Sequence, residues 1–266
     1  MSDYAFTFLL KFVKRRLVTL IILFKNLIVM PLHIKADKKD IAERVLLAGD
    51  PDRVKMLSKM LENARLVNEN RGYITYTGQY KGEKITVSCH GIGGPSIAIV
   101  AEELFLLGAK AMIRFGTIGG LDFDMNYGDL VIATGAFGPV GSTIWQYSKD
   151  VPLPTSPAFE IVEILMQEAK KRNLKHYIGP VYSDDAFYAE GEDYVNKLKN
   201  LGYIGVEMES YTLFGLANLR KFKTGALFMV SNNLLRKTQL LSADELKNYL
   251  ERAAQFVLDS LIKVQI

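Results

Sequence analysis

Apolar residues recur in two different rhythms from Arg44 onward. Short continuous apolar runs predict strands over residues 44–49, 73–80, 84–89, 110–116, 129–136, 176–183 and 224–231. Apolar residues three and four positions apart, such as Val54, Leu57 and Leu61, predict helices over residues 51–63, 95–107, 157–172, 192–200, 208–219 and 243–264. Strands that alternate with helices predict an α/β fold, with a largely parallel or mixed sheet covered on both faces.

The first 29 residues differ in character from this pattern. Their longest apolar run, 17-LVTLIILF-24, has eight residues and ends at Lys25, whereas a membrane-spanning helix needs about 20. No small-residue cleavage site of a signal peptide follows. We favour the interpretation that Met30 is the natural start and that residues 1–29 are a dispensable, non-native extension. A membrane-surface helix and a structural arm are the alternatives. We expect residues 30–266 to form a single domain without membrane association.

Charge and cysteine content exclude several classes of partner. The net charge is +4, and it resides in residues 1–29, which contain five basic residues and one aspartate. The rest of the chain is neutral and has no electrostatic reason to bind nucleic acid. The single cysteine, Cys89, excludes an intramolecular disulfide and indicates a reducing compartment, which we take to be the cytoplasm. The histidines do not have metal-site spacing, so no metal is expected; they are His33, His90 and His176.

Glycine clusters lie at three places where predicted strands end. They are Gly49 before Asp50-Pro51, 91-GIGGPS-96 and 116-GTIGG-120. Glycine lets a backbone approach a ligand closely. Turn chemistry explains any one cluster, but three clusters at the strand ends of one sheet indicate a ligand crevice. None of them has the spacing of a dinucleotide-binding motif.

Three arginines lie close to these glycine clusters. Arg114 is inside an apolar run, and Thr117 follows it. A guanidinium in an apolar strand needs an anionic partner. Arg114 is therefore either half of a structural salt bridge or part of an anion site that arginine forks would build. Taken alone, Arg53 and Arg71 are expected to be solvent-exposed.

The segment 206-VEMES-210 places two carboxylates around a methionine, between apolar residues. Acidic residues in the first turn of a helix are favourable, which explains one glutamate but not the pair. A carboxylate can accept hydrogen bonds from two vicinal hydroxyl groups, such as those of a ribose. Further along, Ser231, Asn232 and Asn233 follow a predicted strand, where open α/β sheets place ligand-binding groups.

At these residues the sequence resembles the hexameric nucleoside phosphorylase family, which includes purine nucleoside, uridine and archaeal methylthioadenosine phosphorylases. The resemblance runs from about Met30 to Leu261 and is closest to the archaeal purine-type members. It is carried by 30-MPLHIKA-36, 49-GDPDR-53, 69-ENRGYITYTG-78, 90-HGIGGPSIAIVAEEL-104, 113-IRFGTIGG-120, 183-SDDAFYAE-190, 206-VEMES-210 and 230-VSNN-233. The family implies a mixed β-sheet that forms a distorted barrel surrounded by helices, and dimers assembled into a hexamer.

The resemblance also implies roles for individual residues. The phosphate-binding set is Gly49, Arg53, Arg71, Arg114 and Thr117, with Arg71 donated by the neighbouring subunit. The nucleoside-binding set is His33, Phe187, Val206, Glu207, Met208 and Glu209. In that set Glu209 holds the ribose hydroxyls, Met208 packs beneath the sugar, and His33 of the neighbour approaches the 5′ position. Phe187 stacks on the base, and Val206 and Glu207 line the base pocket. Catalytic roles fall to Arg114, Ser231 and Asn232, and inorganic phosphate is the co-substrate without a further cofactor.

Asn232 stands where purine-cleaving family members carry an aspartate that protonates or hydrogen-bonds N7 of the base. An asparagine amide only donates and accepts hydrogen bonds, so it cannot supply the proton. The arginine that helps this aspartate also lacks a match in 236-RKTQLLSADE-245. An amide N–H can still donate to N7, which favours 6-oxopurine nucleosides such as inosine and guanosine.

Two alternatives to a purine substrate remain. Uridine phosphorylases also lack the aspartate, but the positions of their base-reading Gln-x-Arg pair are Gly191 and Asp193 here, and Asn233 replaces a further arginine. The chain is also compatible with a nucleoside-binding paralogue whose catalysis is impaired. We favour a purine nucleoside phosphorylase, with a pyrimidine nucleoside enzyme and the impaired paralogue as the alternatives.

Overall fold

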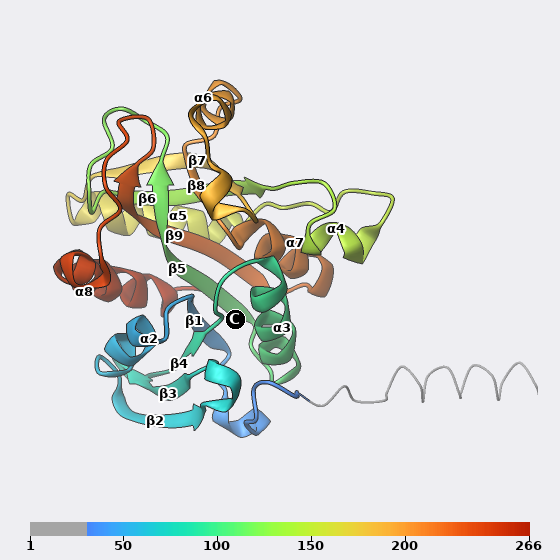
Figure 1. Ribbon diagram of the computed structural model, residues 1–266. Helices are drawn as coiled ribbons and strands as arrows, with labels where there is room; N and C mark the ends of the chain where they lie inside the picture. Colours follow the sequence, from blue (N-terminus) through green and yellow to red (C-terminus); the bar gives the residue numbers. More distant parts are fainter. Residues whose placement is uncertain (1–30) are drawn as a thin grey trace, which may run out of the picture. The chain divides into compact units, whose positions relative to one another are not determined.

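A mixed nine-stranded sheet runs through the described part of the chain, residues 31–266 of a computed structural model (Figure 1). Its order is β2-β3-β4-β1-β5-β8-β7-β6-β9. The strands are β1 Arg44–Ala48, β2 Glu62–Asn68, β3 Thr75–Tyr80, β4 Glu83–Cys89, β5 Ala111–Gly120, β6 Leu130–Phe137, β7 His176–Ser183, β8 Gly205–Glu207 and β9 Lys223–Asn233. β5 also pairs with β9, which closes β5, β8, β7, β6 and β9 into a barrel. The predicted fold class, a mixed barrel surrounded by helices, is confirmed.

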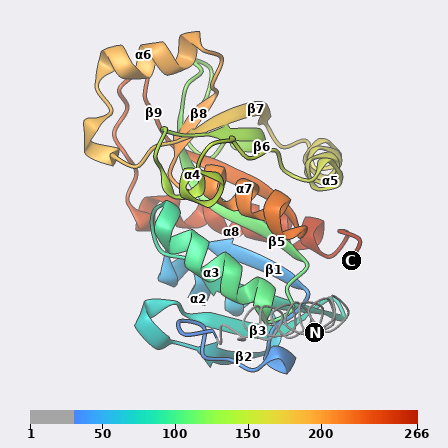
Figure 2. The same ribbon diagram turned by 90° about the vertical axis from the view of Figure 1, so that its right-hand side faces the viewer.

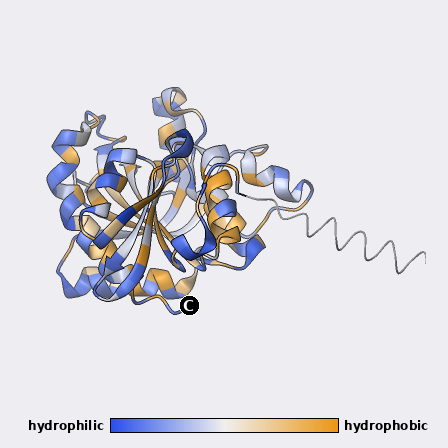
Figure 3. Cartoon of the chain, turned by 90° about the horizontal axis from the view of Figure 1, so that it is seen from below, coloured by the Kyte–Doolittle hydropathy of each residue, from blue (hydrophilic) through white to orange (hydrophobic). Residues whose placement is uncertain are grey.

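Helices cover both faces of this sheet. They are α2 Pro51–Ser58, α3 Gly94–Leu106, α4 Thr143–Ser148, α5 Phe159–Lys171, α6 Glu192–Asn200, α7 Ser210–Arg220 and α8 Ala243–Leu261, with short 3₁₀ turns η1 Lys38–Asp40, η2 Asn70–Gly72 and η3 Phe187–Ala189. Helices α2, α5 and α8 pack on one hydrophobic core, and α3, α4 and α7 on the other. Figure 2 shows α3 and α7 on the same side of the strands. The helices combine apolar and polar stretches (Figure 3), as expected for elements with one buried face.

Strand alternation places Arg114 under helices α3 and α7. Along β5, Ile113 and Phe115 belong to the core on the α2, α5 and α8 side, whereas Met112 and Ile118 belong to the other core. Successive side chains of a strand point to opposite faces. Arg114 therefore faces the second core, at a position where the pattern would otherwise place an apolar residue.

One predicted helix ends earlier than expected. The helix predicted over 51–63 ends at Ser58, because residues from Glu62 onward form β2. β2 is an edge strand whose residues are mostly exposed, so it lacks the apolar run by which buried strands are recognised. The start of the helix is as predicted, since the Asp50 carboxylate accepts a hydrogen bond of 2.8 Å from the backbone N–H of Asp52 and Pro51 opens the first turn.

Two strands extend further than the sequence pattern indicated. β5 continues to Gly120, so 116-GTIGG-120 lies at a strand end as predicted, but as the last five residues of the strand and not as the turn that follows it. Gly116 is required for a different reason: a Cβ there would lie 2.6 Å from Nη1 of Arg114. β9 likewise continues to Asn233, so Ser231, Asn232 and Asn233 are its last three residues.

The unit His33–Ile266 contains all of these elements. The interpretation of residues 1–29 as an extension concerns residues outside the described part of the chain, and it stays a prediction. Within residues 31–266, no helix combines the length and apolar character needed to cross a membrane. No three histidine, cysteine or carboxylate side chains of this part lie close enough together to hold a metal ion.

Candidate active site

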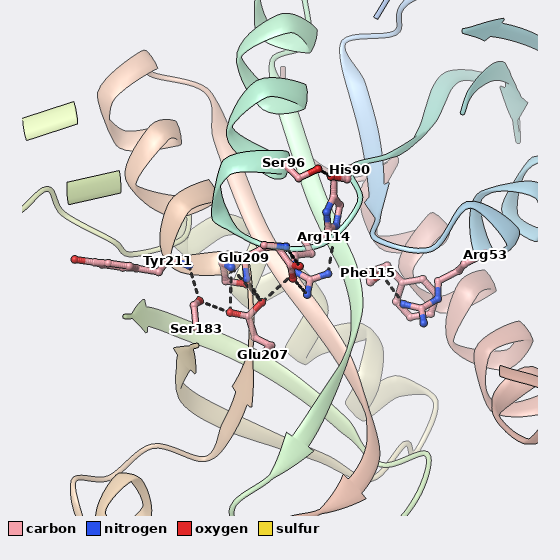
Figure 4. Close-up of polar contacts among 11 residues, drawn as sticks. Arg53, His90, Ser96, Arg114, Phe115, Ser183, Glu207, Glu209 and Tyr211 are labelled. Atoms are coloured by element: carbon pink, nitrogen blue, oxygen red, sulfur yellow. Dashed lines mark hydrogen bonds and ion pairs between the residues drawn. The ribbon is translucent and has the colours of Figure 1, made fainter. Parts of the chain in front are cut away.

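Arg114 forms a buried ion network with the two glutamates of 206-VEMES-210 (Figure 4). Its Nε donates to Oε2 of Glu207 at 3.1 Å, and its Nη2 donates to Oε2 of Glu209. All three side chains are buried, with exposed fractions of 6%, 0% and 4%. The guanidinium also lies over the ring of Phe228, 5.3 Å from its centroid. The structure therefore brings together Arg114, which the resemblance assigns to phosphate binding, and Glu209, which it assigns to ribose binding.

Glu207 serves as the organising acceptor at the start of α7. Its carboxylate accepts hydrogen bonds from the backbone N–H groups of Glu209 and Ser210, at 3.0 to 3.1 Å, and from the hydroxyl of Ser210. The hydroxyl of Ser183 on β7 also donates to it, and in turn accepts from the N–H of Tyr211 at 2.9 Å. A carboxylate that satisfies free N–H groups stabilises a helix start. The prediction that Glu207 lines the base pocket stays a prediction.

Glu209 precedes the first turn of α7 and connects three elements. Besides Arg114 on β5, its carboxylate binds the backbone N–H of Gly93 at 2.7 Å. Burial raises the pKa of Glu209, and the positive charge of Arg114 acts in the opposite direction. The carboxylate thus lies between α7, β5 and the 91–96 loop. Met208 beside it is partly buried, and its predicted place beneath the sugar stays a prediction.

His90 belongs to this network, although the sequence patterns did not single it out. It follows β4, is completely buried, and places Nε2 3.3 Å from Nη1 of Arg114. Burial, with the nearby charges of Arg114 and Arg53, holds the pKa of His90 well below its ordinary value. His90 is therefore a neutral side chain at neutral pH. The available signal was its position at the head of 90-HGIGGPS-96, directly after a predicted strand.

Arg53 is buried, which corrects the expectation that it is a surface arginine. Its Nη1 donates to the carbonyl oxygen of Phe115 at 3.2 Å, and its guanidinium lies 5.6 Å from the centroid of that ring. Burial lowers the pKa of Arg53 to about 10, so the group stays charged at neutral pH. Gly49 allows the close packing here, since a Cβ would lie 2.9 Å from the carbonyl oxygen of Gly91 and 3.3 Å from Cε1 of His90.

The adjacent asparagines at the end of β9 have different surroundings. Asn233 is buried, and its Nδ2 donates to the carbonyl oxygens of Asp122 at 2.7 Å and Met125 at 3.0 Å. Its Oδ1 accepts from the backbone N–H of Arg236 at 3.0 Å. The amide nitrogen thus holds the 122–125 loop and the amide oxygen holds the backbone at Arg236, so both ends of this amide are engaged. Asn233 is therefore a structural residue.

The amide nitrogen of Asn232, in contrast, has no hydrogen-bond partner among the described residues. The side chain is partly buried, and its Oδ1 lies 3.3 Å from the hydroxyl of Ser231. Ser231 also lies 3.3 Å from the carbonyl oxygen of Ile118 on β5. Asn232 pairs with Gly119, next to an irregularity in the β5–β9 register. Of the two asparagines, it is the one with a donor available to a ligand.

The remaining predicted residues lie outside the Arg114 network. His33 and Arg71 form a pair, with Nη1 of Arg71 3.3 Å from Nε2 of His33, and Nδ1 of His33 lies 2.7 Å from Oε1 of Glu103. Arg71 is exposed, as expected, and has a φ of 56°, a strained value for a residue that is not glycine. The other three are Thr117, which is partly buried, Val206, which is buried, and Phe187, which is half-exposed.

Glu190 lies shortly after Phe187, in the loop between β7 and α6. Burial raises the pKa of Glu190 to about 7, with help from the charge of Asp184. A raised carboxyl pKa means that ionisation costs more in the folded protein than in the unfolded chain. The fold is therefore destabilised as the pH rises from the ordinary pKa of a glutamate through 7.

Replacing Glu190 with glutamine should stabilise the protein at pH 8 and have little effect at pH 4.5. Because the carboxyl group is only half-buried, solvent screening reduces the expected gain to about 1 kcal/mol, or about 2–4 °C in Tm. Thermal unfolding at the two pH values measures it. The exposed Glu192, paired with Lys237, provides the matched control, because Glu192→Gln should shift neither value. An equal Tm gain at both pH values would contradict the raised pKa of Glu190.

A family model described as the phosphorylase superfamily matches residues 43–263. The chain belongs to the phosphorylase superfamily. A guanosine phosphorylase of Halorubrum lacusprofundi is 34% identical, over 86% of this chain and 97% of that protein. A purine nucleoside phosphorylase of Mycoplasma genitalium is 36% identical, over 83% of this chain and 94% of that protein.

Solved structures agree with this membership of the phosphorylase superfamily. The uridine phosphorylase of Vibrio fischeri superimposes with a TM-score of 0.79 at 29% identity, covering 88% of this chain and 98% of that protein. The relatives named above thus include proteins named for purine and for pyrimidine nucleosides. The predicted family is confirmed, while the base is a separate question.

Proposed function

We propose that this chain is a nucleoside phosphorylase, which cleaves the N-glycosidic bond of a 6-oxopurine nucleoside with phosphate and gives the free base and (deoxy)ribose 1-phosphate. The observation that carries the proposal is the buried contact between Arg114 and Glu209. The family resemblance assigns Arg114 to phosphate binding and Glu209 to binding of the nucleoside's ribose. The relatives named guanosine phosphorylase and purine nucleoside phosphorylase support the purine class.

The chemistry follows from the charges at the site. Arg53 and Arg114 would hold the phosphate dianion against C1′ of the ribose, whose hydroxyls Glu209 would bind. A phosphate oxygen forms the new bond to C1′ while the C1′–N9 bond breaks and its electron pair goes to the base. The anionic phosphate stabilises the positive charge that develops on the ribose. The base leaves as an anion and takes its proton from solvent.

Asn232 gives the preference for a 6-oxopurine. Its available Nδ2–H would donate to N7, which stabilises a leaving anion without protonating it. The anions of hypoxanthine and guanine leave more readily than that of adenine, so inosine and guanosine need a general acid less than adenosine does. Uridine is the second candidate, because solved uridine phosphorylases share the fold. Against it, Gly191 and Asp193 replace the pair that reads the pyrimidine.

We further infer a cytoplasmic homo-hexamer built as a trimer of dimers, in which each subunit completes its neighbour's site. His33 and Arg71 support this arrangement, since they bind each other and no hydrogen bond joins them to Arg114 within the described residues. Arg71 also combines solvent exposure with a strained backbone, a combination that is common at functional positions.

Base release by the full chain from inosine, guanosine, adenosine, methylthioadenosine and uridine, with and without phosphate, tests the proposal. We expect phosphate-dependent release from inosine and guanosine that exceeds release from adenosine and uridine by about tenfold or more. Release from uridine alone would favour the pyrimidine enzyme. Tight binding of a nucleoside without release of its base would favour the impaired paralogue. Base release at the same rate with and without phosphate would contradict phosphorolysis.

A further inference from the structure

His90 lies where the anion-binding candidates meet. Its Nε2 is 3.3 Å from Nη1 of Arg114, and a Cβ on Gly49 would lie 3.3 Å from its Cε1. Arg53 is close enough for its charge to act on the same imidazole. Figure 4 shows the ring beside the Arg114 guanidinium, with the 91–96 loop continuing from it. The backbone is fixed as well, because the His90 N–H donates to the carbonyl oxygen of Ala48 at 2.9 Å.

The contact with Arg114 determines which ring nitrogen carries the proton. A guanidinium has N–H donors and no acceptor, so Nε2 of His90 must be the acceptor in this pair. In a neutral imidazole the proton then resides on Nδ1. The ring is neutral because it is completely buried between two cations, and no carboxylate of residues 31–266 hydrogen-bonds to it.

The Nδ1–H group is a buried donor that lacks an acceptor among the described residues. A buried donor that is left unsatisfied is unfavourable, because it has lost its hydrogen bond to water without gaining another. Nε of Arg53 is a second buried donor without a partner in this part of the chain. Two unsatisfied donors beside the charges of Arg53 and Arg114 match the acceptor oxygens of an anion.

We propose that His90 is a phosphate-binding residue, whose Nδ1–H donates to an oxygen of the bound anion while its Nε2 holds the Arg114 guanidinium in place. The inference rests on the proposed function, because phosphate is the co-substrate there. A neutral donor adds a hydrogen bond without adding a third positive charge beside two arginines.

Two substitutions separate the two ring nitrogens. Glutamine places an amide near the Nε2 position and can still accept from Arg114, but it lacks a donor at the Nδ1 position. Asparagine places its amide near the Nδ1 position, where it can still donate, but it lacks an acceptor at the Nε2 position. We expect H90Q to raise the Kd for phosphate about tenfold or more, with the Kd for the nucleoside unchanged. H90N keeps the donor, so its Kd for phosphate should rise less than that of H90Q. Its kcat should fall because Arg114 loses one of the contacts that position it, beside those with Glu207 and Glu209.

His176 provides the matched control, since its Nδ1 lies 2.8 Å from the carbonyl oxygen of Leu174 at the start of β7, outside the network. H176Q should leave both dissociation constants unchanged. Calorimetric titration with inorganic phosphate, and separately with inosine, measures them without requiring turnover. Native phosphate affinity in H90Q would overturn the proposal.

Nitrogen NMR of the unmodified full chain tests the same point without a substitution. The chain has three histidines, so ¹⁵N-histidine labelling gives few signals to assign. We expect His90 as the Nδ1–H tautomer, with a signal that moves on addition of phosphate but not of chloride. Phosphate binding that leaves this signal unmoved would overturn the proposal. A shift in a protein without phosphorolysis would support the inference while the proposed function fails.

Discussion

Replacing Asn232 with aspartate should raise kcat/KM for adenosine by about 100-fold. A carboxyl group can carry a proton to N7 of the leaving base, whereas the amide can only donate a hydrogen bond, and general acid catalysis contributes about 10²–10⁴-fold. The side chain is suited to the exchange, since its Nδ2 has no partner among the described residues and the site is only partly buried. Steady-state phosphorolysis of adenosine and inosine measures the effect, which should be smaller for inosine.

Asn233→Asp is the matched control, one residue away and with the same chemical change. Its Nδ2 donates to two backbone carbonyl oxygens, so an aspartate would place negative charge against Asp122 O and Met125 O. We expect no gain in activity and a loss of about 2–4 kcal/mol in the free energy of unfolding, measured with denaturant. If Asn232→Asp leaves adenosine cleavage unchanged while the protein stays folded, Asn232 does not face the leaving base.

Replacing Glu209 with glutamine should lower kcat/KM for inosine by about 100- to 1,000-fold. The carboxylate can accept charge-assisted hydrogen bonds from both ribose hydroxyls, each worth about 1.5–3 kcal/mol, and the amide offers one neutral oxygen. Tm should fall as well, because the single amide oxygen cannot accept from both Gly93 and Arg114, and Arg114 keeps only Glu207 as an ion-pair partner within residues 31–266. Steady-state kinetics and thermal unfolding of the same preparation measure the two quantities.

Glu102→Gln controls for the loss of one glutamate charge. Glu102 binds Arg220 on the surface at 2.8 Å, away from the site, and an exposed pair contributes about 0–1 kcal/mol. We expect its substitution to leave kcat/KM unchanged. Unaltered kinetics in a folded Glu209→Gln protein would show that the ribose hydroxyls are not held by this carboxylate.

The elements with continuous apolar runs could be predicted, because burial on both faces gives them a clear pattern. β1 is of this kind, whereas α3 and α5 could be predicted from apolar residues at helical spacing on their buried faces. β2 and β8 could not. β2 is an exposed edge strand, and β8 has three residues, too few for a periodicity. β8 nevertheless completes the barrel, so the closure of the sheet was available only through the family resemblance.

The site was predictable where a single residue is costly without a partner. Arg114 is such a residue. Its partners Glu207 and Glu209 also stand out in the sequence, because the start of a helix explains one acidic residue but not the pair. Arg53 and His90 were not anticipated as buried, since burial depends on the packing of the 91–96 loop against Gly49. The sequence also does not show that the amide nitrogen of Asn233 is engaged while that of Asn232 has no partner among the described residues. This difference arises from hydrogen bonds to the 122–125 loop, more than 100 residues away in the chain.

The Arg114–Glu209 pair makes the two substrates thermodynamically dependent on each other. Glu209 has Arg114 as its ion-pair partner, whereas Arg114 also binds Glu207, so phosphate that engages Arg114 would weaken its contact with Glu209. Phosphate bound to Arg114 would make the Glu209 carboxylate more available to the ribose hydroxyls. A ribose bound first to Glu209 would in the same way make Arg114 more available to phosphate. Linkage requires that the two effects be equal. The pair would thus favour the ternary complex over either binary complex, which limits unproductive occupancy of the site.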